Sequence, residues 1–425
     1  MRPKQIVSHL KGENTKTLTK NFSALAILQL LRYFIPLIVL PYVTPIIGLE
    51  HFGEIAIASS FTLIVQVFVN YSFSFMGARD IARNRDDKDK VSEIVSKTIF
   101  AYIGIYAIML VLSFLLIILV PKFQSIWLLI SINLLTPIFS AMVCEWFFQG
   151  IEKMHNITIV NTLSRVLFLV LVFVLIKKED DYILFPVCEV LGHILAGLYS
   201  IIMMTTKYKC KIHFPGGNSI LDYIKQGKDL FLNQSCVLLF NRLPNILLGN
   251  ISGNSAAGLY HAAFRLQEAG CHGVDTLNRT FFPFLARRMD KHKAYRRINL
   301  MFALFIAIVL FVFAPFLVRL LYAPDFAPAV RILRILSFSI LFLGISSAYG
   351  VNHLLLIGEE KLVRNITFCV TGGGLLLLLL MIRLFNETGA SLTMVIVNAS
   401  FALSYFIASK KVKHKTETQR DGANQ

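Results

Sequence analysis

The chain has 425 residues, of which 56% are hydrophobic and only 16% are charged, and its formal net charge is +17. A soluble protein of this length could not bury so much apolar surface, and apolar runs of about 20 residues recur along the chain. The composition therefore indicates a polytopic helical membrane protein. It argues against a nucleic-acid-binding protein, because no soluble segment is large enough to form a basic folded domain.

Hydropathy predicts about twelve membrane-spanning helices. The first six lie near residues 21–47, 53–77, 94–120, 124–149, 155–176 and 182–206. The second six lie near residues 228–250, 255–286, 298–322, 328–357, 362–385 and 388–409. Strongly basic loops alternate with short loops that contain few basic residues. The positive-inside rule therefore places the basic loops and both termini in the cytoplasm.

Two short segments of the first half recur in the second half. Gly150-Ile-Glu-Lys-Met154 resembles Gly358-Glu-Glu-Lys-Leu362, and each is followed by an Asn-Ile-Thr sequence. Gly53-Glu-Ile-Ala-Ile-Ala58 resembles Gly258-Leu-Tyr-His-Ala-Ala263. Matches at similar offsets and at equivalent helix positions predict two parallel six-helix lobes, an architecture of transporters that bind substrate in a central cavity between the lobes.

The predicted organisation therefore has four parts. They are an N-terminal six-helix lobe (1–206), a cytoplasmic basic connector (207–227), a C-terminal six-helix lobe (228–409) and a cytoplasmic basic tail (410–425). Pro215-Gly216-Gly217-Asn218 is expected to break any helix within the connector.

Six ionisable side chains share one face of the eighth predicted helix: His261, Arg265, Glu268, His272, Asp275 and Arg279. They are spaced by steps of three and four residues, which places them on one arc of an α-helix about 27 Å long. Charged groups inside a membrane usually face a bundle interior or a water-filled cavity. The alternative is that Arg265 with Glu268, and Asp275 with Arg279, form ion pairs that only allow the helix to insert.

Three other predicted helices, the first, second and seventh, also have a polar face. Interhelical hydrogen bonds explain their amides equally well, but Arg32 and Arg242 lie too deep in their helices to reach the membrane surface. We expect a cationic, substrate-binding lumen formed by Arg32, Arg242, Arg265 and Arg279. The expected polar lining of this lumen is Gln66, Asn70, Asn241, His261, Glu268, His272 and Asp275.

Among these residues the four arginines outnumber the two carboxylates, so the lumen would be cationic. A guanidinium group binds phosphate oxygens bidentately. The lumen therefore favours an acidic or phosphate-bearing substrate. Glu145, Glu189 and His193 are further charged or titratable residues within predicted spans. They are candidates for ion coupling, with a satisfied interhelical hydrogen bond as the alternative.

The segment Glu145-Trp-Phe-Phe-Gln-Gly-Ile-Glu-Lys-Met154 resembles the signature at the end of the fourth helix in O-antigen flippases. These form the polysaccharide-transporter branch of the multidrug/oligosaccharidyl-lipid/polysaccharide superfamily. Asn21-Phe-Ser, Pro41-Tyr42 with Gly48, and Phe75-Met-Gly-Ala-Arg-Asp-Ile-Ala-Arg83 support the resemblance.

This resemblance implies a two-lobed, inverted-V transporter in the bacterial inner membrane. Such a protein moves undecaprenyl-pyrophosphate-linked oligosaccharide repeat units from the cytoplasmic to the periplasmic leaflet by alternating access, driven by an ion gradient of protons or sodium or by the membrane potential. Arginines in the first and eighth helices are important in related lipid-linked sugar flippases. The resemblance therefore implies that the matching residues here, Arg32 and Arg265, are important for transport. The expected partners are the lipid-linked substrate, membrane lipid, the coupling ion, an O-antigen polymerase and a chain-length regulator.

Two other functions stay open at this point. An ion-coupled antiporter of drugs or metabolites has the same fold, but a transporter of cations would need lumen carboxylates, and here the arginines outnumber them. An O-antigen polymerase would need a large periplasmic loop with catalytic residues, whereas every predicted outer loop is short. Because the sequence contains no paired catalytic carboxylates, nucleophile elbow or metal motif, it predicts a transporter without cofactor or metal rather than an enzyme.

Overall fold

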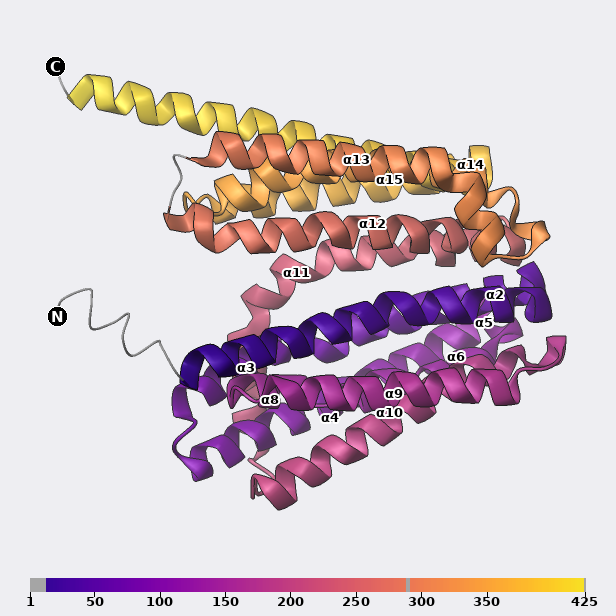
Figure 1. Ribbon diagram of the computed structural model, residues 1–425, viewed down its shortest axis with the longest axis horizontal. Coiled ribbons are helices and arrows are strands. Elements are labelled where there is room, and N and C mark those ends of the chain that lie inside the picture. The colour runs from indigo at the N-terminus through magenta and orange to yellow at the C-terminus, as the bar shows by residue number, and fades with distance from the viewer. Residues whose placement is uncertain (1–12, 288–290, 424–425) are drawn as a thin grey trace. The chain divides into compact units, whose positions relative to one another are not determined.

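The computed structural model describes residues 13–287 and 291–423, and all regular secondary structure in these ranges is helical (Figure 1). For some residues in these helices the structure describes the backbone but not the side chain: residues 13–34, 36, 229, 230, 233, 234, 283, 284, 286 and 413–423. The predicted all-helical class is confirmed.

Eight described helical segments are long and apolar enough to cross a membrane. They are Leu37–Asn84, Lys88–Leu119, Trp127–Gly150, Met154–Leu175, Glu179–Lys207, His292–Leu321, Ala329–Leu354 and Glu360–Val412. The first and last are 48 and 53 residues long, more than twice the roughly 20 residues of one crossing. Each contains a backbone break, at Gly48 and at Asn386. The chain is thus a multi-pass membrane protein, and the count of twelve spans stays a prediction.

The described helices divide by their contacts into two compact units. Unit 1 holds the chain up to Ile47 and residues 61–235, and unit 2 holds residues 48–60 and 236–425. The segment 48–60, which follows the break at Gly48, therefore packs with the second half of the chain.

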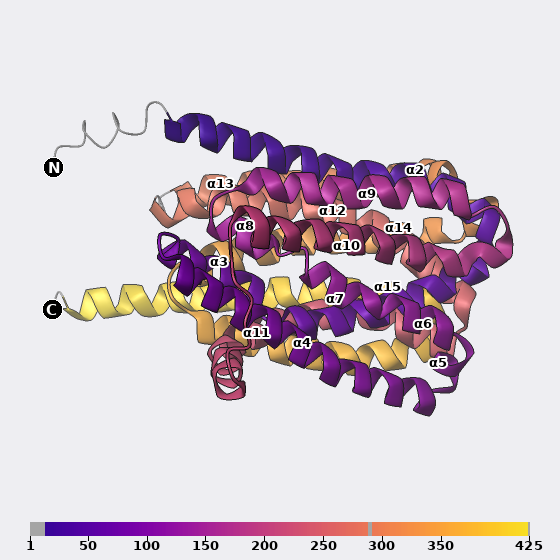
Figure 2. The same ribbon diagram turned by 90° about the horizontal axis from the view of Figure 1, so that it is seen from below.

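Unit 1 is built from the first twelve elements, the last of which continues into unit 2. They are α2 (Glu13–Asn70), α3 (Phe73–Asn84), α4 (Lys88–Leu119), α5 (Pro121–Ser125), α6 (Trp127–Asn133), α7 (Leu135–Ala141), α8 (Glu145–Gly150), α9 (Met154–Leu175), η1 (Glu179–Ile183), α10 (Leu184–Ile202), η2 (Met203–Lys207) and α11 (Gly217–Ile251). Helices α9 and α10 pack along each other (Figure 2). The fourth predicted helix, 124–149, is divided into α6, α7 and α8, and Cys144, which immediately precedes α8, has a left-handed backbone (φ 49°).

Helix α4 begins with a side-chain cap. The carboxylate of Asp87 accepts hydrogen bonds from the backbone N–H groups of Asp89 and Lys90, both at 3.1 Å, and so satisfies two amides that the first turn leaves unpaired. These hydrogen bonds, led by that from Lys90, lower the pKa of the Asp87 carboxyl.

The connector is more ordered than a loop around Pro215-Gly216-Gly217-Asn218 would suggest, because α11 begins at Gly217. The segment that precedes α11 lies along α4, where the backbone N–H groups of Lys211 and His213 donate to Ser92 and Ser96 Oγ at 3.1 and 3.2 Å. The Tyr223 hydroxyl accepts a hydrogen bond from Thr98 at 3.2 Å. Three side chains of α4 thus fix the connector and the first turns of α11 to unit 1.

Unit 2 is a bundle of helices in which α12, α13, α14 and α15 lie side by side (Figure 1). Its further elements are α12 (Asn254–Arg287), α13 (His292–Leu321), η4 (Pro324–Phe326), α14 (Ala329–Ser346), η5 (Ser347–Leu354) and α15 (Glu360–Ala423). Val274, Ala303 and Ile340 belong to its buried core. Large apolar side chains such as Phe305 and Phe316 on α13 are exposed, as expected of a surface that faces lipid.

Candidate substrate site

The stripe predicted for the eighth helix lies on α12, which is one helix from Asn254 to Arg287. His261 is buried, Arg265, Glu268 and Asp275 are half-buried, and His272 and Arg279 are exposed. The six side chains therefore follow one continuous helix, as their spacing predicted. Their neighbours within unit 2 divide the stripe into two groups. The upper group, near the start of α12, contains His261, Arg265 and Glu268. The lower group, nearer the end of α12, contains Asp275 and Arg279.

The start of α12 lies unusually close to the 48–60 segment of α2. A Cβ atom on Gly53 would come within 1.9 Å of the Asn254 carbonyl oxygen, and one on Gly258 would come within 2.9 Å of the Leu49 carbonyl oxygen. Glu54 Oε1 accepts a hydrogen bond from Asn254 Nδ2 at 3.1 Å. Gly53 and Gly258 open the two segments whose sequences resemble each other, so these similar segments pack directly together.

A buried hydrogen-bond network connects this crossing with the stripe. The side-chain amide of Asn245 on α11 lies 2.8 Å from Ser60 Oγ and 3.1 Å from His261 Nδ1. Arg265 Nε donates to His261 Nε2 at 3.0 Å. His261 thus orients the Arg265 guanidinium, and Asn245 orients His261.

The carboxylate of Glu268 pairs with an arginine from another helix. Arg242 Nη2 on α11 donates to Glu268 Oε1 at 2.9 Å, and the Arg242 guanidinium also lies 5.9 Å from the Phe264 ring centroid. The sequence offered Arg265 as the partner of Glu268 within one helix. The ion pair that the structure describes is with Arg242 instead, because α11 packs beside α12 and brings a second guanidinium to the carboxylate.

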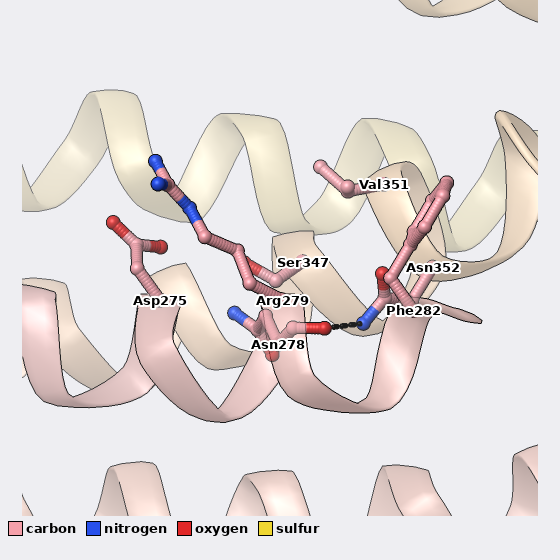
Figure 3. A pocket seen from close by; sticks show the side chains of 7 residues that line it. All are labelled: Asp275, Asn278, Arg279, Phe282, Ser347, Val351 and Asn352. Atoms are coloured by element: carbon pink, nitrogen blue, oxygen red, sulfur yellow. Dashed lines mark hydrogen bonds between the residues drawn. The ribbon is translucent and has the colours of Figure 1, made fainter. Parts of the chain in front are cut away.

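The lower group lines a pocket of about 390 Å³ between α12 and η5 (Figure 3). Asp275, Asn278, Arg279 and Phe282 come from α12, and Ser347, Val351 and Asn352 come from η5. Asp275 and Arg279 point to the same side of α12, so the pocket offers both an anionic and a cationic group (Figure 3). The volume is within the range of small-ligand pockets.

Three predicted ion-coupling residues gather inside unit 1. Glu145 Oε1 accepts a hydrogen bond from Asn161 Nδ2 on α9 at 2.7 Å. His193 on α10 interacts electrostatically with Glu189, Arg165 and Glu145. The structure therefore brings together residues from α8, α9 and α10, and it adds Arg165 and Asn161 to the predicted set.

The remaining predicted residues lie apart from these groups or outside the described side chains. Gln66 donates to Ser140 Oγ at 2.9 Å, an interhelical bond of the kind that the alternative reading expected. Asn70 and Asn241 are half-buried. The side chain of Arg32 lies outside the described residues, so its predicted role stays a prediction.

Two motifs that carried the family resemblance contact each other in unit 1. A Cβ atom on Gly77 of α3 would come within 2.7 Å of Trp146 Cε3 in α8, and one on Gly150 would come within 2.7 Å of Ile81 Cβ. Trp146, Phe147 and Phe148 are almost fully buried. The signature around Trp146 therefore fixes the packing of α8 against α3, which is a structural role.

Sequence reasoning missed several residues of the lower pocket. Asn278 follows Asp275 by three residues and so lies on the stripe face, a signal that was available in the sequence. Ser347 and Asn352 had no such signal, because their helix contributes no charged stripe. Among the residues that the structure describes, no group of three or more His, Cys, Asp or Glu side chains could hold a metal ion.

The helical units described above define a membrane transporter fold. An inward-facing multidrug resistance MATE family transporter of the MOP superfamily has a TM-score of 0.66, with 13% identity over 90% of this chain and 99% of that one. The lipid II flippase MurJ, in an inward closed conformation, has a TM-score of 0.61, with 12% identity over 91% of this chain and 87% of that one. At such identities the likeness concerns the fold alone.

The sequence identifies the family more closely than the fold does. The model of the family described as "Polysaccharide biosynthesis protein" matches residues 18–289, and the chain belongs to this family. Two relatives carry the name "Putative O-antigen transporter". That of Escherichia coli (strain K12) is 26% identical over 402 residues, which cover 90% of this chain and 94% of the relative. That of Shigella dysenteriae is 27% identical over 269 residues, which cover 63% and 67%.

The resemblance predicted from the sequence is thereby confirmed. The chain is a multi-pass membrane protein of a transporter family involved in polysaccharide biosynthesis, and it is not an enzyme. The polymerase interpretation therefore has no support from these comparisons.

Proposed function

We propose that the chain is a flippase for lipid-linked oligosaccharides. It would move undecaprenyl-pyrophosphate-linked O-antigen repeat units from the cytoplasmic to the periplasmic leaflet of the bacterial inner membrane by alternating access. The observation that carries the proposal is a pair of arginines in unit 2. Arg242 is held by Glu268, and Arg265 is held by His261. Family membership and the names of the two relatives support the cargo.

The two arginines have the chemistry that a pyrophosphate needs. The hydrogen bond to His261 uses one of the five N–H groups of Arg265, and the other four are on the terminal nitrogens that bind phosphate oxygens in pairs. Arg242 is neutralised by Glu268, so an incoming pyrophosphate would compete with a carboxylate for this guanidinium. Such a pair lowers the cost of a buried cation when no substrate is bound.

The proposed architecture completes this mechanism. Twelve spans in two parallel lobes, 1–206 and 228–409, would enclose a central cavity, with the connector 207–227, the tail 410–425 and both termini in the cytoplasm. Helix α2, which has 58 residues and is broken at Gly48, and the 53-residue segment broken at Asn386 would each cross twice. Adding the polar helices α11 and α12 to the eight apolar segments then gives twelve. Arg32 and Arg279 would add cationic charge to the cavity.

Ion coupling would use the group inside unit 1. Glu145, Glu189 and His193 interact electrostatically within unit 1, and ionisable groups inside a membrane bundle commonly belong to ion or proton pathways. The coupling ion would be a proton or sodium. The downstream partners would be an O-antigen polymerase and a chain-length regulator, which use the repeat unit after it has crossed.

The first experiment is genetic. Deleting the gene in its own host should abolish the lipopolysaccharide ladder, and the wild-type gene should restore it. Arg265→Ala should restore less than about a tenth of the ladder, since removal of a charge-assisted contact costs about 1.5–3 kcal/mol. Arg83→Ala, which removes an exposed arginine of α3, is the control and should restore the ladder fully.

Each result has a distinct meaning. A ladder restored by Arg265→Ala at normal expression would overturn the assignment of Arg265 but not the flippase. A deletion strain with an unchanged ladder, no other lost surface glycan and no redundant transporter would overturn the flippase. Resistance to cationic dyes on overexpression would then favour the drug or metabolite antiporter.

A further inference from the structure

Two almost fully buried side chains of the lower pocket have hydrogen-bonding atoms without a partner. Asn278 is 6% exposed and Asn352 is 0% exposed, and both line the pocket. Neither Asn278 Nδ2 nor Asn352 Oδ1 has a hydrogen-bond partner among the described residues. An unsatisfied buried polar atom costs about 1–3 kcal/mol, so a site with two of them is built to receive a polar group.

The surrounding hydrogen bonds determine which atoms are left over. Asn352 Nδ2 donates to the backbone carbonyl of Asn278 at 3.3 Å (Figure 3). It also donates to the Tyr295 hydroxyl at 2.5 Å. A carbonyl can only accept, so the amide of Asn352 must present its nitrogen to it. The Tyr295 hydroxyl, having accepted from Asn352, donates to Asn278 Oδ1 at 2.7 Å. The remaining atoms are therefore one donor, on Asn278, and one acceptor, on Asn352.

The π-helix η5 places three of the lining residues. A π-helix has wider turns than an α-helix and is common at functional sites, because it rotates side chains out of the regular pattern. Here Ser347, Val351 and Asn352 all reach the pocket from one segment. Val351 and Phe282 add apolar surface to a pocket whose other lining residues are Asp275, Arg279, Ser347 and the two asparagines.

We propose that this pocket binds the sugar part of the lipid-linked substrate through an acetamido group. An acetamido oxygen accepts from Asn278 Nδ2, its N–H donates to Asn352 Oδ1, and its methyl group contacts Val351 and Phe282. Asp275 and Arg279 bind neighbouring sugar hydroxyls. The inference rests on the proposed flippase function and adds to it the chemical class of sugar that the protein selects.

The test measures binding to the full-length protein in nanodiscs. Three probes are compared: farnesyl pyrophosphate, farnesyl-pyrophosphoryl glucose and farnesyl-pyrophosphoryl N-acetylglucosamine. The wild type should bind all three, and the acetamido-bearing probe should bind about tenfold more tightly than the glucose probe, since one hydrogen bond pair is worth about that factor. Asn278→Asp keeps the oxygen that accepts from Tyr295 but removes the donor, so this preference should fall to about one.

The preference between two sugar probes is the readout, because a change in charge or folding would shift both dissociation constants together. Should Asn278→Asp not fold, Val351→Ala replaces it: this change removes apolar surface that contacts the acetamido methyl group and should lower the preference for the acetamido probe, and an unchanged preference would overturn the sugar site. Ser346→Ala is its control, because that hydroxyl donates to the Leu343 carbonyl and is not among the pocket-lining residues.

The outcomes separate the two proposals. A wild type that binds farnesyl pyrophosphate but does not distinguish the two sugars, or an Asn278→Asp protein with the wild-type preference, would overturn the sugar site alone. A wild type that binds none of the three probes would overturn the flippase proposal and the sugar site with it.

Discussion

Glu268 shows that a half-buried carboxylate can pair with an arginine of another helix rather than with one in its own helix. Within α12 its neighbour at i−3 is Arg265, yet the ion pair in the structure joins it to Arg242 of α11, and Arg265 binds His261 instead. A charge that leaves water needs a close, well-aligned partner, and a guanidinium from a packed neighbouring helix supplies this as well as one in the same helix. The charges of the stripe are thus satisfied between helices as well as along one.

We expect measurable coupling between Arg242 and Glu268. Their side chains are only 20% and 32% exposed, so a double-mutant cycle with Arg242→Ala and Glu268→Ala should give a coupling energy of about 1 kcal/mol. Thermal or denaturant unfolding in detergent measures it. The matched control is Arg85 with Glu152, an ion pair at 3.0 Å whose side chains are 51% and 65% exposed, and which should show coupling near zero. Equal coupling in both cycles would contradict the importance of burial.

Two helix contacts depend on glycine. The 48–60 segment crosses α12 at Gly53 and Gly258, and α3 packs on α8 at Gly77 and Gly150. Without a Cβ atom, backbones approach closely enough for van der Waals packing to hold membrane helices together. The motif that identified the family and the segments that suggested a repeat both lie at such crossings, so these sequence features reflect packing.

Gly53→Ala should therefore be strongly destabilising. The added Cβ atom would lie 1.9 Å from the Asn254 carbonyl oxygen, which is backbone and cannot rotate away. Overpacking of this kind costs about 1–3 kcal/mol. Gly104→Ala in α4 is the control, because a Cβ atom there has nothing within 4 Å, and alanine should raise stability by about 0.5–1 kcal/mol. Melting temperatures of the purified proteins that moved in the same direction would refute the close approach.

At the scale of the whole molecule, two features of the sequence concern the membrane. The apolar content predicts how many segments cross it, and the loop charges predict the orientation of the chain. Eight apolar segments establish a multi-pass protein, and the polar stripes keep α11 and α12 out of that set. Orientation rests on a different signal, the distribution of lysine and arginine among the loops, which favours cytoplasmic termini.

Reporter fusions test this orientation. Alkaline phosphatase fused after Asp180 or Asp325 should be active, because these positions lie in the predicted periplasmic loops. Green fluorescent protein fused after Arg85 or Gln425 should fluoresce, because basic segments stay in the cytoplasm. An active phosphatase after Arg85, with none after Asp180, would reverse the predicted orientation of the first half.

The sequence by itself determined the class of membrane protein, the family and the face of α12 on which the charges lie. Hydropathy and helical periodicity are local properties, and the spacing of His261, Arg265 and Glu268 holds in any straight helix. The segment Glu145–Met154 indicated the family from its sequence alone, and in the structure its aromatic side chains are buried, with Trp146 packed on Gly77.

Only the tertiary structure decided which side chains meet. The partner of Glu268 lies 26 residues away on another helix, Asn245 reaches His261 across a helix boundary, and Asn352 joins Asn278 from 74 positions along the chain. The unpaired amide atoms exist only because Tyr295 and a backbone carbonyl occupy the others. Hydrogen bonds act over about 3 Å, so contacts between distant segments depend on packing that no local pattern encodes.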